Sequence, residues 1–138
     1  MAGLKANQLH TGVITAVATV VAGTIKTSDA IGAQEAAIQS IPAGGTIAIT
    51  APKTQLLPIQ GSGAAVTASN TPFGTTPPKN GTRIIVIGGH DTNTVELAHN
   101  DAVNGCLLVG PAKLKKYAQI EFLYVGAFSR YVEVTRNF

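Results

Sequence analysis

The chain has 138 residues, of which 45% are apolar and 12% are charged, and its net charge is +3. This length suits one domain whose hydrophobic core is large enough to fold without disulfide bonds or bound metal ions. The single cysteine, Cys106, excludes an internal disulfide and a Cys-x-x-Cys zinc site, and the small basic surplus is weak support for a nucleic-acid partner.

The low charge content bears on the protein surface. Charged residues are present at about half the share of an ordinary soluble domain. One interpretation is that copies of the chain, or another protein, cover much of a surface that is short of solubilising groups. The other interpretation, a neutral surface rich in Thr, Ser and Asn, stays open.

Residues 1–11 show no strong periodicity and are expected to form an N-terminal arm ahead of a single domain over 12–138. Val and Thr alternate in part from Val13 to Val21, which predicts a strand that continues through Gly23–Thr27. This stretch is too short to span a bilayer, and no secretory signal is recognisable. We therefore expect a protein made in the cytoplasm, without membrane association.

The segment from Ala30 to Ser40 is the one helical candidate. Asp29 is placed to cap a helix and Pro42 to end it, whereas Gly32 weakens the pattern. One or two turns of helix and a pair of strands are both compatible with these residues.

Two further strands are expected before residue 61. A turn over 42–45 leads to a predicted strand at Thr46–Thr50, and Gln55–Gln60 is extended but carries Pro58, which is typical of an edge strand. The next residues, 61–80, are rich in Gly, Pro, Ser and Thr. A long loop of this composition is either mobile or functional.

Short strands then follow at near-regular spacing, with Gly and Asn turns between them. They are expected at Arg83–Ile87, Thr94–Ala98, Cys106–Val109, Ala118–Val125 and Phe128–Thr135, the last two forming a hairpin. Ile120, Phe122 and Tyr124 would share one face of their strand. The pattern predicts an all-β, single-domain, jelly-roll-like sandwich or barrel with at most one short helix.

Two histidines and an aspartate invite an enzymatic interpretation. His90-Asp91 and His99 lie in successive turns and could meet as a base or a metal site. Their spacing favours solvated turn formers instead. The sequence also has no nucleophile elbow and no phosphate-binding loop, so we expect no catalytic, metal or cofactor site.

The remaining charged residues have structural interpretations. Glu96, Glu121 and Glu133 fall in strands and are expected to face outward, paired with cations such as Lys26, Arg130 and Arg136. Lys113, Lys115 and Lys116 form the one basic cluster, with no interleaved aromatic residues to stack on bases. We interpret them as charges that flank an apolar strand. Cys106 is expected to be a small buried hydrophobe.

Four motifs stand out in the C-terminal residues, about 80–138. They are Asn80-Gly81-Thr82-Arg83-Ile84-Ile85-Val86-Ile87-Gly88, Asp91-Thr92-Asn93-Thr94-Val95-Glu96-Leu97, Asn104-Gly105 before an apolar strand, and the closing Tyr131-Val132-Glu133-Val134-Thr135-Arg136-Asn137. Together they resemble small β-rich virion proteins of tailed bacteriophages. Tyr131 stands where such modules commonly have Trp. Head decoration (cement) proteins and tail-fibre tip modules have strand motifs of this kind.

The resemblance implies a non-enzymatic homotrimer on the outer surface of the virion capsid, where it bridges capsomers and stabilises the mature head. The implied partner is the major capsid protein, with no nucleic acid, membrane or cofactor. The arm and the Pro-rich loop supply the expected capsid contacts: Leu4, Lys5, Asn7, Leu9, Pro72, Phe73, Pro77 and Pro78. Deletion of residues 1–8 is expected to abolish shell binding.

Two alternatives stay open. A tail-fibre or receptor-binding module would usually carry upstream repeats or a coiled coil, and the sequence shows neither. A small jelly-roll enzyme or metal-binding cupin would need His and carboxylate residues on one inward face, and the histidines lack the His-x-His spacing of such a strand.

Overall fold

The computed structural model describes residues 34–49 and 55–138, which belong to one compact unit, Gly32–Phe138. The regular structure in these ranges is β-strand, which confirms the predicted all-β class. In chain order the strands are β1 Gln34–Glu35, β2 Gln39–Ile41, β3 Gln55–Gly61, β4 Val66–Thr67, β5 Arg83–Gly88, β6 Val95–Leu97, β7 Cys106–Leu107, β8 Ala112–Leu114, β9 Gln119–Val125 and β10 Arg130–Asn137. Among the described residues no helix is long and apolar enough to cross a membrane.

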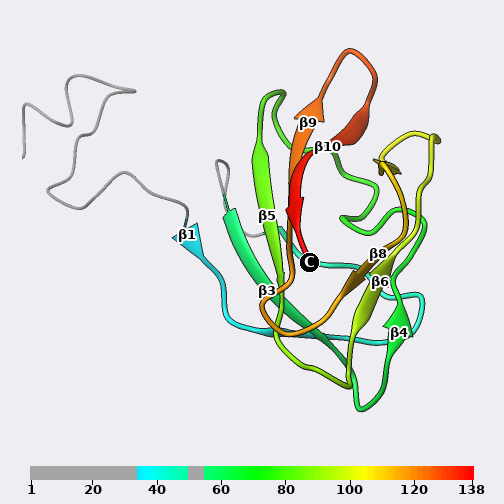
Figure 1. Cartoon of the computed structure of the whole chain (residues 1–138). Coiled ribbons are helices and arrows are strands. Elements are labelled where there is room, and N and C mark those ends of the chain that lie inside the picture. Colours follow the sequence, from blue (N-terminus) through cyan, green and yellow to red (C-terminus); the bar gives the residue numbers. More distant parts are fainter. Residues whose placement is uncertain (1–33, 50–54) are drawn as a thin grey trace, which may run out of the picture. The chain divides into compact units, whose positions relative to one another are not determined.

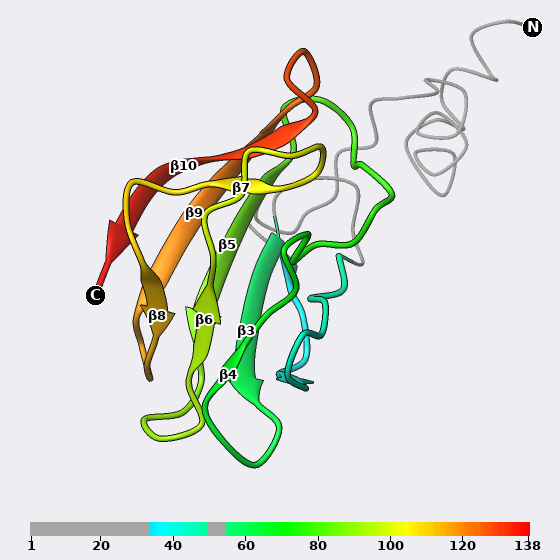
Figure 2. The same ribbon diagram turned by 90° about the vertical axis from the view of Figure 1, so that its right-hand side faces the viewer.

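The strands form two sheets that face each other (Figures 1 and 2). The larger sheet has the order β1-β3-β5-β9-β10-β7, with β2 also paired to β3, and the smaller sheet has the order β4-β6-β8. This two-sheet arrangement confirms the prediction of a sandwich or barrel. The chain passes repeatedly from one sheet to the other between β3 and β9.

The first part of the fold is a stack of parallel layers, which the sequence did not predict. Gln55 lies opposite Ile84 in the larger sheet and Val66 opposite Val95 in the smaller sheet, so both registers advance by 29 residues (55 to 84 and 66 to 95). β1 and β2 add a further layer, also parallel to β3. Equal offsets in both sheets mean that β3–β4 and β5–β6 follow the same path, one above the other.

The core lies between the sheets. Alternate residues of β3, β5 and β9 point inward, and Ile120, Phe122 and Tyr124 are all buried, as predicted. From the smaller sheet, Val95 and Leu114 meet them at 0–1% exposure. Cys106 is also buried, as expected, and burial raises the pKa of its thiol.

The structure decides one open alternative and corrects one prediction. Over residues 34–41 it has the strand pair β1 and β2, which was one of the two expected possibilities, and not a helix. The strand predicted at Thr46–Thr50 is wrong over 46–49, because the backbone of Ala48 is bound by a side chain. Gln39 Oε1 accepts from Ala48 N at 2.8 Å and Gln39 Nε2 donates to Ala48 O at 3.0 Å. These two side-chain hydrogen bonds take the place of the backbone hydrogen bonds that Ala48 would make to a neighbouring strand.

The edge position predicted for the strand with Pro58 is also wrong. β3 lies inside the sheet, between β5 on one side and β1 and β2 on the other. Leu56 O accepts from Ala36 N, so Leu56 and Pro58 direct their backbone groups toward β1 and β2. The missing N–H of Pro58 therefore faces the break between these two short strands, where no ladder bond is lost.

The hairpin of β9 and β10 closes the larger sheet as predicted, with a register shift between Glu133 and Thr135. Glu133 pairs with Arg136, one of the expected partners, and also accepts from Val109 N at 2.9 Å. Glu121 pairs instead with Arg83, at 2.5 Å between Oε1 and Nη1. The short strand β8 was not predicted.

Candidate functional site

The outer face of the larger sheet is apolar where an ordinary solvated sheet would be polar. Many of the residues that alternate with the core positions of β3, β5, β9 and β10 are half-buried and aliphatic: Leu56, Pro58, Ile85, Ile87, Leu123, Val125 and Val132. The others are polar or charged: Gln60, Arg83, Gln119, Glu121 and Arg130. A sheet with one solvated face normally alternates apolar inward and polar outward residues. We call this set the outer face. Its composition suits contact with another protein surface.

The registers bring these residues side by side. Leu56 lies opposite Ile85, Pro58 lies opposite Ile87, and Leu123 lies opposite Val132. Neighbours on one face of adjacent strands are close enough to contact each other. The outer face therefore has one apolar patch on β3 and β5 and another on β9 and β10. Between them, Ile85 lies opposite Glu121 and Ile87 opposite Gln119.

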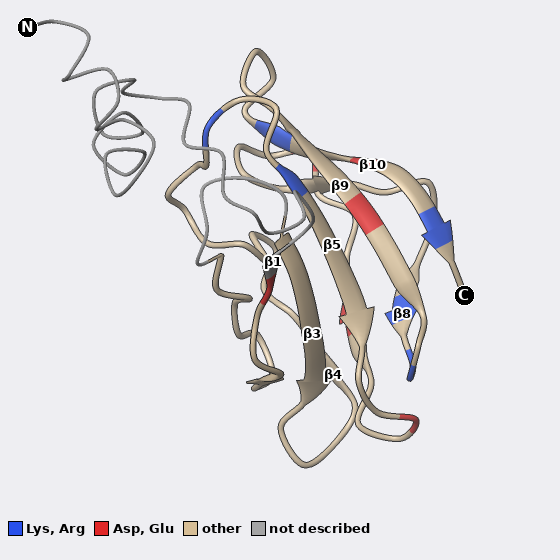
Figure 3. Cartoon of the chain, turned by 90° about the vertical axis from the view of Figure 1, so that its left-hand side faces the viewer, with Lys and Arg blue, Asp and Glu red and all other residues tan. Residues whose placement is uncertain are grey.

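Two charges in the middle of the outer face compensate each other. Figure 3 shows β3 and β5 almost free of charged residues, apart from the start of β5, and one acidic position on β9. These positions are Arg83 and Glu121, which form the 2.5 Å pair. The Arg83 side chain is 51% exposed, so the pair itself adds little stability. Arg130, at the start of β10, adds a positive charge whose hydrogen bonds go to backbone carbonyl groups.

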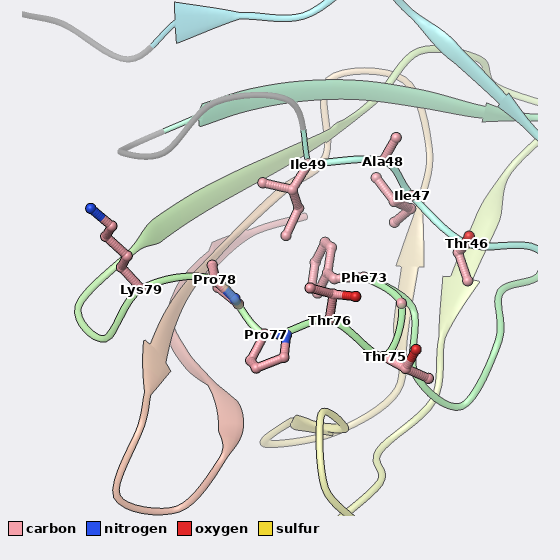
Figure 4. Close-up of a pocket in the computed structure, with 11 residues that line it drawn as sticks. Thr46, Ile47, Ala48, Ile49, Phe73, Thr75, Thr76, Pro77, Pro78 and Lys79 are labelled. Carbon is pink, nitrogen blue, oxygen red and sulfur yellow. The ribbon is translucent and has the colours of Figure 1, made fainter.

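A groove lies at the side of this unit, between residues 46–49 and the loop at 73–79, with a volume of about 500 Å³ (Figure 4). Ile47 and Phe73 form its apolar floor and are both buried. In Figure 4, Ile47 and Ile49 point toward Phe73, whereas Lys79 points away from them. Thr46, Thr75 and Thr76 add hydroxyl groups, and Pro77 and Pro78 complete the lining.

The loop that forms one wall is fixed by packing and hydrogen bonds. The Phe73 ring packs 5.4 Å from Phe122 and 4.7 Å from Tyr131 between centroids. Ile47 N donates to Pro72 O at 2.6 Å, and Asn104 Nδ2 donates to Thr75 O at 2.8 Å. The groove thus keeps its form without a partner, which lowers the entropic cost of binding one.

The chemistry of the groove is that of apolar side chains and hydroxyl groups. Among the described residues that line it there is no His, Cys, Asp or Glu, and the charged side chain is that of Lys79. Apolar walls with a few hydroxyl groups suit an extended, weakly polar segment of a partner protein.

The expected capsid contacts fall into three groups. Leu4, Lys5, Asn7 and Leu9 lie outside the described residues. Pro72 and Phe73 are buried, and of the two only Phe73 lines the groove, as part of its floor. Pro77 is exposed and Pro78 half-buried, and both line the groove. The opposite wall, 46–49, was missed because those residues were predicted to form a strand.

The two histidines act within turns. His90 Nδ1 accepts from Asn93 N at 3.0 Å and from Thr92 N at 3.2 Å, while His99 Nδ1 accepts from Leu108 N at 3.1 Å. Their Nδ1 atoms thus bind the backbone. In residues 34–49 and 55–138, no three His, Cys, Asp or Glu side chains are grouped so as to hold a metal ion.

Comparison with protein families, with known proteins and with solved structures finds no match to this chain. The function proposed below therefore depends on the surface of the protein and on the resemblance of its C-terminal residues.

Proposed function

We propose that this chain is a non-enzymatic virion protein of a tailed bacteriophage, which decorates the outside of the mature head and stabilises it by bridging capsomers. The observation that carries the proposal is the outer face, in which two half-buried apolar patches lie on either side of one ion pair. A surface of this kind is best explained by a protein partner. The proposed assembly is a homotrimer bound to the major capsid protein.

The two surfaces have separate roles in this proposal. The outer face carries two apolar patches and few charges, so it suits contact between copies of the chain. The groove is narrow and rigid, so it suits a segment of the capsid protein, together with the N-terminal arm. Three linked copies would bind a shell far more tightly than one copy, because the second and third contacts become intramolecular.

Self-association is tested by measuring the mass in solution by sedimentation. The wild-type chain is expected to be trimeric, and Ile87→Lys is expected to be monomeric with an unchanged circular dichroism spectrum. Thr67→Lys, on an exposed position of the smaller sheet, is the matched control and should stay trimeric. A monomeric wild-type chain would contradict the proposal that copies of the chain associate through the outer face.

Shell binding is tested by co-sedimentation with mature heads that lack the protein. Pro77→Glu places a charge in the groove at an exposed position and should weaken binding at least tenfold. Ala127→Glu, in the exposed turn between β9 and β10, is the control and should bind as the wild type does. Equal binding by the two variants would exclude the groove as the docking site.

A second candidate, a tail-fibre module, is favoured by one observation. The parallel layers of β1–β6 repeat the same path with an equal offset in both sheets. Stacks of this kind extend by adding layers, which suits an elongated appendage. The position of the protein on the particle separates the two functions.

A further inference from the structure

A second cavity, of about 410 Å³, brings together the basic cluster and two exposed aromatic rings. It lies between the turn that follows β8 and the end of β10, and these elements are adjacent in both Figures 2 and 3. Lys113, Lys115, Lys116, Tyr117 and Phe138 line it. Phe138 is 21 residues from Tyr117 in the sequence (117 to 138), so only the pairing of β9 with β10 makes them neighbours.

Tyr117 has a backbone conformation that its residue type disfavours. Its φ angle is +68°, in the left-handed region, and its side chain is 76% exposed. A tyrosine in this region lowers the free energy of unfolding relative to a glycine. Because the ring is exposed, its packing contacts offset little of this loss. Strained residues are concentrated at binding sites, because function holds them there against the folding cost.

The turn that carries Tyr117 is held rigidly against Gly88. Tyr117 N donates to Gly88 O at 2.9 Å, and Gly88 N donates to Ala118 O at 2.8 Å. A Cβ atom on Gly88 would lie 1.9 Å from Lys115 O, so the close approach needs glycine at this position. The backbone that carries the ring, Lys115 and Lys116 is therefore held in place before any ligand binds.

The charges of this cavity are unbalanced. No carboxylate of the described residues lies within ion-pair distance of the three lysine ammonium groups. Lys116 Nζ lies 5.1 Å from the centroid of the Tyr117 ring, which leaves the ammonium group beside an aromatic face. Asp91 adds a carboxylate that can accept hydrogen bonds, and Asn137 adds a side-chain amide, at the same cavity.

We propose that this cavity binds an anionic saccharide. The lysines would bind its carboxylate, sulfate or phosphate group, the Tyr117 and Phe138 rings would cover the C–H face of a sugar ring, and Asp91 and Asn137 would bind hydroxyl groups. Asp91 disfavours a nucleic acid, because a chain of closely spaced phosphates would meet its carboxylate. A volume of about 410 Å³ also fits within the usual range for sites that hold small ligands.

The test is binding of the purified chain to an array of carboxylated, sulfated and phosphorylated glycans beside their neutral counterparts. The wild type is expected to bind at least one acidic glycan at least tenfold more tightly than its neutral counterpart. Tyr117→Gly and Lys116→Gln should each lose at least tenfold in affinity. Phe128→Ala changes an exposed ring outside the cavity and should bind normally.

Thermal unfolding separates a binding role from a structural one. Tyr117→Gly relieves the left-handed strain, so its unfolding temperature should not fall while its glycan binding is lost. Absence of acidic-glycan binding, or binding that survives Tyr117→Gly, would overturn the inference. Tighter binding of single-stranded DNA than of any glycan would also overturn it. The experiment uses the isolated chain, so its result is independent of the proposed place on the virion.

Discussion

The rings of Phe73 and Tyr131 lie 4.7 Å apart between centroids and are tilted by 50°. Phe73 comes from the loop that forms the groove, and Tyr131 comes from β10, so this contact joins the groove to the closing hairpin. Both side chains are at least 95% buried, at 5% and 0% exposure. The part of the predicted loop that follows β4 is thus anchored by an aromatic side chain in the core, although its composition left open that it is mobile.

Replacement of Phe73 by alanine should lower the free energy of unfolding by about 3–5 kcal/mol, because it removes a buried ring and leaves a cavity. The groove should lose its floor at the same time. Phe128→Ala is the control, since Phe128 is 58% exposed, and it should change stability by about 0.5 kcal/mol or less. Denaturant unfolding measures both, and equal effects would contradict the anchoring role of Phe73.

Tyr131→Phe should stabilise the protein by about 1 kcal/mol. The Tyr131 hydroxyl is buried without a hydrogen-bond partner among the described residues, and burial raises the pKa of its phenol. Removal of an unsatisfied polar atom relieves a desolvation cost while the ring contacts stay in place. The change is measured as a shift in the denaturant midpoint. A loss of stability would show that the hydroxyl contributes favourably.

Gly88→Ala should destabilise the protein by about 3 kcal/mol, because the added methyl group overlaps Lys115 O and forces the turn away from β5. Gly110→Ala is the matched control. A Cβ there meets no atom within 4 Å, so stability should change by about 0.5 kcal/mol or less. Thermal unfolding of both variants checks the prediction, and a stable Gly88→Ala protein would contradict the close approach at this turn.

Glu133 should make stability dependent on pH in the acid range. Its hydrogen bond with Arg136, assisted by the bond from Val109 N, lowers the pKa of the carboxyl below its ordinary value of 4.5 against the opposing effect of burial. A lowered pKa in the folded state gives stability that is present above pH 4.5 and is lost as the pH falls further.

Glu133→Gln should therefore cost about 1.5 kcal/mol at pH 7 and progressively less as the pH falls below 4.5. Arg136 also donates to the carbonyl oxygens of Gly110 and Pro111, so weakening the pair should loosen the turn that precedes β8. Chemical denaturation of both proteins across this pH range gives the comparison. A constant difference between them would show that the pair does not titrate as described.

Local alternation was enough to predict the parts of the fold that depend on neighbouring residues. The alternation of Ile120, Phe122 and Tyr124 set the buried face of β9, and the short connection after Val125 set the hairpin. The parallel layers were not predictable in this way, because the pairing of Gln55 with Ile84 depends on contacts between segments far apart in the chain.

The errors have local physical causes. The pattern at 46–49 is that of a strand, but Gln39 takes the backbone groups of Ala48. Proline is excluded from an inner strand only where its missing N–H would leave a backbone hydrogen bond unmade. Pro58 lies opposite the break between β1 and β2, so no such bond is lost there. The candidate sites were only partly predictable, since the outer face and the cavity of Tyr117 and Phe138 depend on which strands become neighbours.

The measurement that tests the central claim most directly is the number and position of copies of this protein on purified phage particles, by quantitative gel analysis and labelled electron microscopy. The account predicts hundreds of copies spread over the outside of the mature head. A few copies confined to the tail would instead support the fibre module, and absence from the particles would contradict a virion role altogether.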